Sequence, residues 1–92
     1  MRVTDAIVQR DGPAGPRAAL AHGPDVWEVI ATYRTVGNRI APTARHLGLD
    51  PSDVDAALTK YRANAGEIDA RLRTETELAE RAYAEWAEGR AR

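Results

Sequence analysis

The side chains of this chain that could do chemistry are scattered cations and hydroxyls, and they favour contacts to DNA over catalysis. We expect the DNA contacts to come from Arg39, Arg45, Ser52, Thr59, Lys60 and Arg62. Guanidinium, ammonium and hydroxyl groups are the donors that proteins present to phosphates and base edges. Asp50, Asp53 and Asp55 stand among them, and phosphates repel each carboxylate. DNA binding is therefore expected of a dimer, which brings the basic residues of two copies together.

No catalytic set is visible in the sequence. His22 and His46 are far apart and there is no cysteine, so the ligand set of a structural zinc site is missing. The run of glycine and proline at 12–16 lacks the lysine and the serine or threonine that a phosphate-binding loop requires. We expect a protein that is not an enzyme and that uses neither a metal nor a cofactor.

The residues that must position these donors have the spacing of a helix-turn-helix between Ile40 and Tyr61. Ala44 allows a short first helix to pack closely on the second, and Gly48 tolerates the positive φ that the turn needs. Asp50 is expected as the N-cap of the second helix, with Pro51 at its first position. The alternative is that these helices form only a compact structural core.

The segment before the helical region, 1–24, is rich in glycine and proline, which excludes a long helix. Short strands are expected at 2–8 and 17–21, with pairing to a second copy or disorder up to about residue 13 as the alternatives. Three arginines of this arm could reach a DNA backbone, namely Arg2, Arg10 and Arg17. A first helix should follow, capped by Asp25 and ended by Gly37.

The last segment, 66–92, is rich in alanine, glutamate, arginine and leucine and predicts one long helix after an interruption at Asn64–Gly66. Its apolar stripe is longer than three short helices could cover, so part of it should bind a partner as a helix in a groove. The expected partner-binding residues are Ile68, Leu72, Ala79, Tyr83 and Trp86, with the two aromatics as anchors. The alternative is that this helix folds back or pairs only with its copy.

These segments predict a mainly α fold: an arm at 1–24, a helix-turn-helix three-helix bundle at 25–65, and a long C-terminal helix at 66–92. A chain of 92 residues buries little apolar surface by itself, so a homodimer is expected. No long apolar segment or signal peptide is apparent, which favours a cytoplasmic protein without a membrane span. The net charge of −1 provides no global attraction to nucleic acid.

Several runs of residues together resemble a family of small bacterial antitoxins built on an otherwise uncharacterised domain, similar in role to VapB-type antitoxins. The runs are Gly15-Pro16-Arg17, Gly23 to Ile30, Leu47-Gly48-Leu49, Val54 to Leu58, Tyr61 and Glu67 to Arg71. The resemblance implies binding to a cognate PIN-like ribonuclease toxin and to operator DNA. The chain departs from the family at Gly23-Pro24-Asp25, where members commonly have a Gly-Thr-Arg step between two strands, so the resemblance does not extend to a hairpin. A stand-alone helix-turn-helix transcriptional regulator and a structural dimerisation module are the alternatives.

Overall fold

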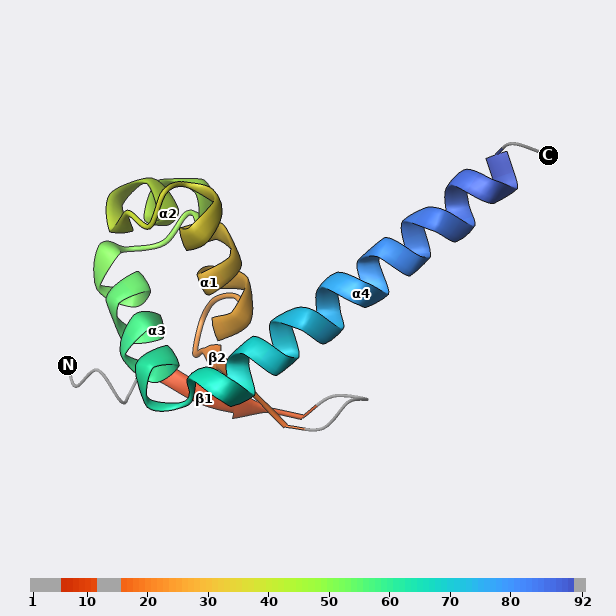
Figure 1. Ribbon diagram of the computed structural model, residues 1–92. Helices are drawn as coiled ribbons and strands as arrows, with labels where there is room; N and C mark the ends of the chain where they lie inside the picture. The colour runs from red at the N-terminus through yellow and green to blue at the C-terminus, as the bar shows by residue number, and fades with distance from the viewer. Residues whose placement is uncertain (1–5, 12–15, 91–92) are drawn as a thin grey trace.

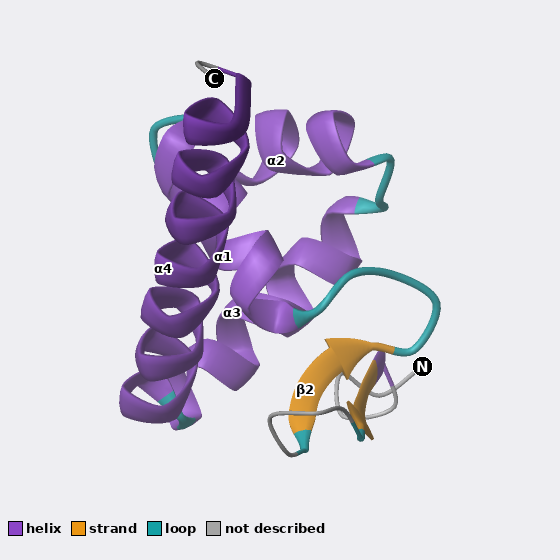
Figure 2. Cartoon of the chain, turned by 90° about the vertical axis from the view of Figure 1, so that its right-hand side faces the viewer, coloured by secondary structure: helices purple, strands orange, loops and turns teal. Residues whose placement is uncertain are grey.

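The structure, a computed structural model, describes residues 6–11 and 16–90 and is mainly helical, as the sequence predicts (Figure 1). In chain order its elements are β1 (Ile7–Arg10), β2 (Arg17–Leu20), α1 (Val26–Thr35), α2 (Ile40–Leu47), α3 (Pro51–Ala63) and α4 (Ala65–Arg90). The hairpin and α2 lie at opposite ends of the bundle that α1 and α3 complete (Figure 2).

The two strands pair with each other as an antiparallel hairpin, with Ile7 opposite Leu20. Side chains alternate across a strand, and the face that carries Ile7, Ala18 and Leu20 packs against the core. The expectation of short strands is confirmed for the described residues, whereas residues 2–5 of the first predicted strand lie outside them. The hairpin forms although the sequence departs from the family's two-strand step at Gly23-Pro24-Asp25, and β2 belongs to the core rather than to a detached arm.

Two of the N-terminal arginines, Arg10 and Arg17, are engaged inside the chain instead of reaching outward. The Arg10 guanidinium donates to the backbone oxygens of Leu20, Ala21 and Gly23 at 3.0, 3.2 and 3.1 Å. These bonds hold the connection between β2 and α1. The structure therefore assigns Arg10 to local architecture, and Arg2 lies outside the described residues.

Asp25 stands at the N-cap of α1, but its side chain makes no capping bond, contrary to the expectation. Its carboxylate accepts the Nε proton of Arg17 at 2.5 Å and the indole N–H of Trp27 at 3.2 Å. A charge-assisted bond to a guanidinium is stronger than one to a backbone amide. The buried Asp25 therefore ties α1 to β2, which also bridges to it through Ala19.

The turn between α2 and α3 has the predicted geometry. Gly48 adopts φ +67, in the left-handed region, and the N–H of Leu49 donates to the oxygen of Ala44 at 2.8 Å. The Asp50 carboxylate accepts the backbone N–H of Ser52 at 2.9 Å, with Pro51 beginning α3. Both bonds from Ser52, one from its backbone and one from its hydroxyl, hold the pKa of Asp50 below its usual value. The helix-turn-helix is therefore built from local signals.

The core lies where α1, α2 and α3 meet the hairpin and the start of α4. It consists of Leu20, Val26, Val29, Ile30, Ala44, Val54, Ala57, Leu58 and Ile68. Because α3 packs on α1 and α2 and also on the hairpin, even Ala56 is only 2% exposed. Because α3 is buried on two sides, only a narrow strip of its surface is exposed to solvent.

The fourth helix is a single element of 26 residues, about 39 Å long. It begins at Ala65, so the predicted interruption shrinks to Asn64, and Gly66 lies within the helix. Its first turns pack on α1 and α3, and its second half extends away from the bundle (Figure 1). Within the residues described, no helix combines the length and the apolarity needed to cross a membrane.

Candidate functional site

The first half of α4 is held by a polar network that joins three helices. Arg34 of α1 donates through Nη2 to Asp69 Oδ1 at 2.9 Å and to the Tyr61 hydroxyl oxygen at 2.8 Å. The Tyr61 hydroxyl donates to Asp69 Oδ1 at 3.0 Å, and the Arg34 guanidinium lies 5.5 Å from the Tyr61 ring centre. This network, together with buried Ile68, sets the direction in which α4 leaves the bundle.

The same contacts shift two ionisation equilibria. The hydrogen bond from Arg34 holds the pKa of Asp69 below its usual value, and the bond to Asp69 raises the pKa of Arg34. Sequence reasoning singled out the pattern that contains Tyr61 and Asp69 but did not identify Arg34. The sequence feature that could have identified Arg34 is its position near the end of an amphipathic helix, next to Tyr33 on the apolar side of that helix.

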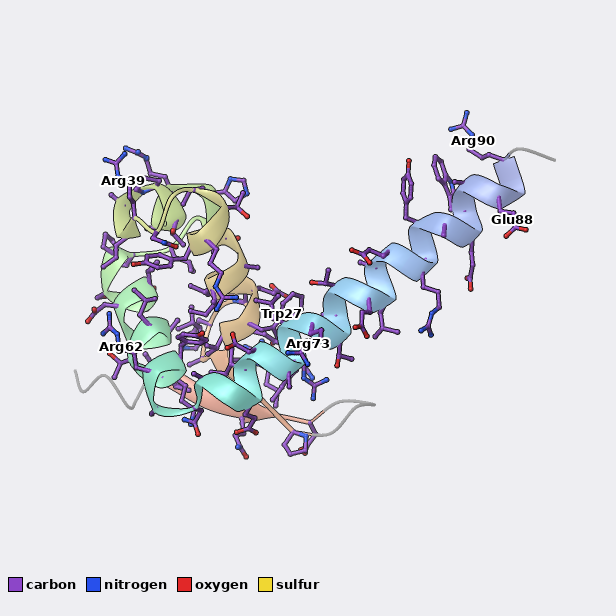
Figure 3. The ribbon with its side chains drawn as sticks, in the orientation of Figure 1. Trp27, Arg39, Arg62, Arg73, Glu88 and Arg90 are labelled. Carbon is purple, nitrogen blue, oxygen red and sulfur yellow. The ribbon has the colours of Figure 1, made fainter. Side chains whose placement is uncertain are left out.

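The second half of α4 presents an exposed apolar face, which consists of Leu78, Ala79, Ala82, Tyr83 and Trp86. Its three large side chains, Leu78, Tyr83 and Trp86, are 48%, 68% and 55% exposed. The rings of Tyr83 and Trp86 are 5.7 Å apart at 41°, and the Arg90 guanidinium lies 5.0 Å from the Trp86 ring centre (Figure 3). Exposed apolar patches on a small domain mark interaction sites.

The structure divides the five predicted partner-binding residues between two tasks. Ile68 is 6% exposed and Leu72 packs against the core, so both stabilise the chain's own fold. Ala79, Tyr83 and Trp86 lie beyond the bundle and are exposed. Leu78 and Ala82 are also exposed and complete the accessible face. A partner that binds α4 in this conformation meets the apolar face but not Ile68.

The charges on the projecting half of α4 are mostly acidic. Residues 76–90 carry four glutamates, Glu77, Glu80, Glu85 and Glu88, against the two arginines Arg81 and Arg90. Glu77 lies on the opposite side of the helix from Trp86, so the acidic balance belongs to this half as a whole and not to the border of the apolar face.

Three of the predicted DNA-contacting residues, Ser52, Thr59 and Arg62, share the exposed strip of α3, whereas the other three lie elsewhere. Arg39 lies at the α2 end of the bundle, and Arg62 lies toward the opposite end of α3 (Figure 3). Arg45 is exposed on α2. Lys60 lines a groove beside α4. The Thr59 hydroxyl donates to the oxygen of Asp55 at 3.0 Å, and that of Ser52 donates to Asp50 at 2.8 Å.

A groove of about 320 Å³ separates the hairpin from the first turns of α4. Trp27, Ala18 and Ile68 contribute apolar lining, and three cationic side chains line it as well, those of Arg17, Lys60 and Arg71. Arg17 pairs with Asp25, and Arg71 lies 3.7 Å from Glu75. The volume is at the lower end of the range for small-ligand pockets.

Acidic side chains meet where α4 passes α1. Burial, followed by the charges of Asp25 and Glu75, raises the pKa of Glu28. Among the described residues, no group of three or more His, Asp or Glu side chains is arranged to hold a metal ion.

Comparison with protein-family models, curated proteins and solved structures finds no match to this chain. The geometry of the described residues is therefore the main guide to function. Its most distinctive feature is the apolar face on the projecting half of α4.

Proposed function

We propose that this protein is an antitoxin-like regulator that binds a cognate toxin through the apolar face of α4. The observation that carries the proposal is the exposure of Leu78, Tyr83 and Trp86 on a helix that extends beyond its own bundle. The resemblance noted in the sequence supplies the class of partner, a PIN-like ribonuclease. Binding is sufficient for neutralisation, since a helix seated in the enzyme's groove excludes RNA from it.

The energetics of α4 support a role in binding. An isolated helix of about 12 to 15 residues is marginal in water, and residues 76–90 are almost entirely exposed. A partner groove would bury the apolar face and stabilise this half of the helix. Tyr and Trp are among the residues most often found to dominate binding energy, and here they stand one turn apart.

The test is co-expression with the product of the neighbouring reading frame, followed by measurement of binding and of ribonuclease activity. Tyr83→Ala and Trp86→Ala should each weaken binding by about 2–4 kcal/mol and release the ribonuclease. Glu77→Ala is the matched control because Glu77 lies on the opposite side of the helix from Trp86. Wild-type affinity in both aromatic variants, or no binding by the unaltered chain, would refute the proposal.

Binding of the protein's own promoter is the second candidate function, and the turn at Gly48 favours it. The helix-turn-helix geometry places α3 after a left-handed glycine and an Asp50 cap. A dimer would present two such units to successive major grooves. Affinity for the upstream DNA should then fall steeply with salt and fall further in Arg45→Ala. No complex at low salt, with or without the toxin, would exclude this function.

A further inference from the structure

The groove between the hairpin and the first turns of α4 is lined by side chains of five elements. They include Gln9 of β1, Ala18 of β2, Trp27 of α1, Lys60 of α3 and Ile68 of α4. Figure 3 shows Trp27 beside the first half of α4. Helices and strands position a binding site more precisely than loops do. None of the lining residues belongs to the apolar face of α4, so the groove is a separate site.

One wall of the groove is apolar and held in place. The indole N–H of Trp27 donates to the Asp25 carboxylate at 3.2 Å, which fixes the orientation of the ring. Trp27 and Ala18 pack against the core, and Ile68 belongs to it. The groove volume of about 320 Å³ is sufficient for a ligand with one ring and a few polar groups. This wall therefore offers a preformed contact to a small hydrocarbon side chain.

Two charged side chains of opposite sign in the groove are unpaired. Arg17 and Arg71 also line it, and each already has an acidic partner. Within the part of the chain that the structure describes, no hydrogen bond or ion pair engages the Lys60 ammonium or the Glu67 carboxylate. The groove thus presents one available cation and one available anion next to its apolar wall.

We propose that this groove binds a free α-amino acid with an apolar side chain. The carboxylate of the ligand pairs with Lys60, its ammonium pairs with Glu67, and its side chain lies against Trp27. A simple carboxylate would meet Glu67 as a like charge, and a simple amine would meet Lys60 in the same way. Charge complementarity therefore favours a zwitterion over either singly charged analogue.

The two charged contacts differ in expected strength. Lys60 is half-buried, whereas Glu67 is exposed, and an ion pair weakens where water and salt screen it. The carboxylate of the ligand should therefore contribute more to affinity than its ammonium. The side chain contributes further by leaving water. Because the folded chain alone provides the site, the ligand should also raise the thermal midpoint of the protein.

The first experiment uses the fact that Lys60 is the single lysine of the chain. In the full chain carrying isotope-labelled lysine, titration with L-phenylalanine should shift one side-chain NMR signal until it saturates. Glycine has the same two charges without the apolar side chain, and it should bind about tenfold more weakly. The shift reports on the groove itself, because the signal belongs to a residue that lines it.

The second experiment separates the two charges by isothermal titration calorimetry. Hydrocinnamate lacks the ammonium of phenylalanine and should bind the natural chain about threefold more weakly. Phenethylamine lacks the carboxylate and should bind about tenfold more weakly. Glu67→Gln should abolish the first difference, and Lys60→Ala should abolish the second. A general loss of structure would instead weaken all three ligands alike.

Two matched variants serve as controls. Arg62 follows Lys60 by two residues and lies on the opposite side of α3, so Arg62→Ala should leave the affinity for phenylalanine unchanged. Glu77→Gln, on the projecting half of α4, should do the same. No saturable shift of the Lys60 signal, equal affinity for glycine and phenylalanine, or ligand discrimination that persists in either groove variant would overturn the proposal. No toxin is needed, so this result is independent of the proposed function.

Discussion

The two halves of α4 share one continuous helix and differ in what holds them. Residues 65–75 contribute Ile68 to the core and Asp69 to the network with Arg34 and Tyr61. Residues 76–90 have similar amphipathic character, yet their large apolar side chains face water. The difference shows that one continuous apolar stripe can be buried at one end and exposed at the other.

The largest effect that tests this comparison is expected from equivalent truncations in the two halves. Ile68→Ala should lower the free energy of unfolding by about 2–4 kcal/mol because it leaves a cavity in the core. Leu78→Ala removes a similar side chain from an exposed site and should cost the monomer under about 0.5 kcal/mol. Chemical denaturation at low protein concentration measures both. Equal losses would mean that the second half of α4 also packs within one chain.

The next effect concerns the turn that positions the bundle beneath α4. Gly48→Ala places a Cβ at φ +67, which should cost about 1–2 kcal/mol. No atom outside the turn lies within 4 Å of that Cβ, so the loss would be one of backbone strain and not of a clash. Denaturation of this variant beside Gly66→Ala, at a helical glycine with equal open space, separates strain from packing. A Gly48→Ala variant as stable as the natural chain would contradict the strained turn.

A smaller effect is expected from the network that anchors α4, and it depends on pH. The folded pKa of Asp69 is lowered, so its contribution is present above the ordinary carboxyl pKa and is lost as pH falls through the folded value. Asp69→Asn should lower the thermal midpoint at pH 7 and weaken the acid dependence. Thermal melts between about pH 2 and pH 7 measure this. Thr76→Ala, on the exposed half, serves as the control and should leave the pH profile unchanged.

Only a small effect on monomer stability is expected from removing the exposed half altogether. Deleting residues 76–92 should change the free energy of unfolding of the bundle by less than about 1 kcal/mol, because this half contributes nothing to the core cluster. The same deletion should abolish the proposed toxin contact. A truncated chain that loses its fold would show that the division between the halves is wrong.

Local elements could be predicted where neighbouring residues carry the signal. Gly48, Asp50 and Pro51 specify a turn and a helix start within a few residues, and all three occupy the expected positions. Asp25 misled the prediction because its carboxylate finds Arg17 on another element. A carboxylate at an N-cap position can accept a hydrogen bond either from a backbone N–H of its own helix or from a side chain on another element. The sequence alone does not show that such a distant donor is close by.

The candidate site, like the local elements, could be predicted from the sequence only in part. Type and spacing singled out Tyr83 and Trp86, which the structure shows to be exposed, and their role as anchors stays a prediction. Periodicity, however, placed Ile68 on the same stripe as these aromatics and could not indicate where the bundle ends. Arg34 escaped notice because its partners, Tyr61 and Asp69, lie 27 and 35 residues away.

By itself the sequence determined the helical class, the turn at Gly48 and the amphipathic character of α4, because propensity, capping and periodicity act over a few residues. Tertiary structure alone decided which part of that stripe is buried, where the N-terminal arginines bond, and that β1 and β2 pair with each other. Burial and charge pairing depend on which elements meet. In a chain of this size the bundle ends before α4 does, and the remainder of its apolar face stays exposed.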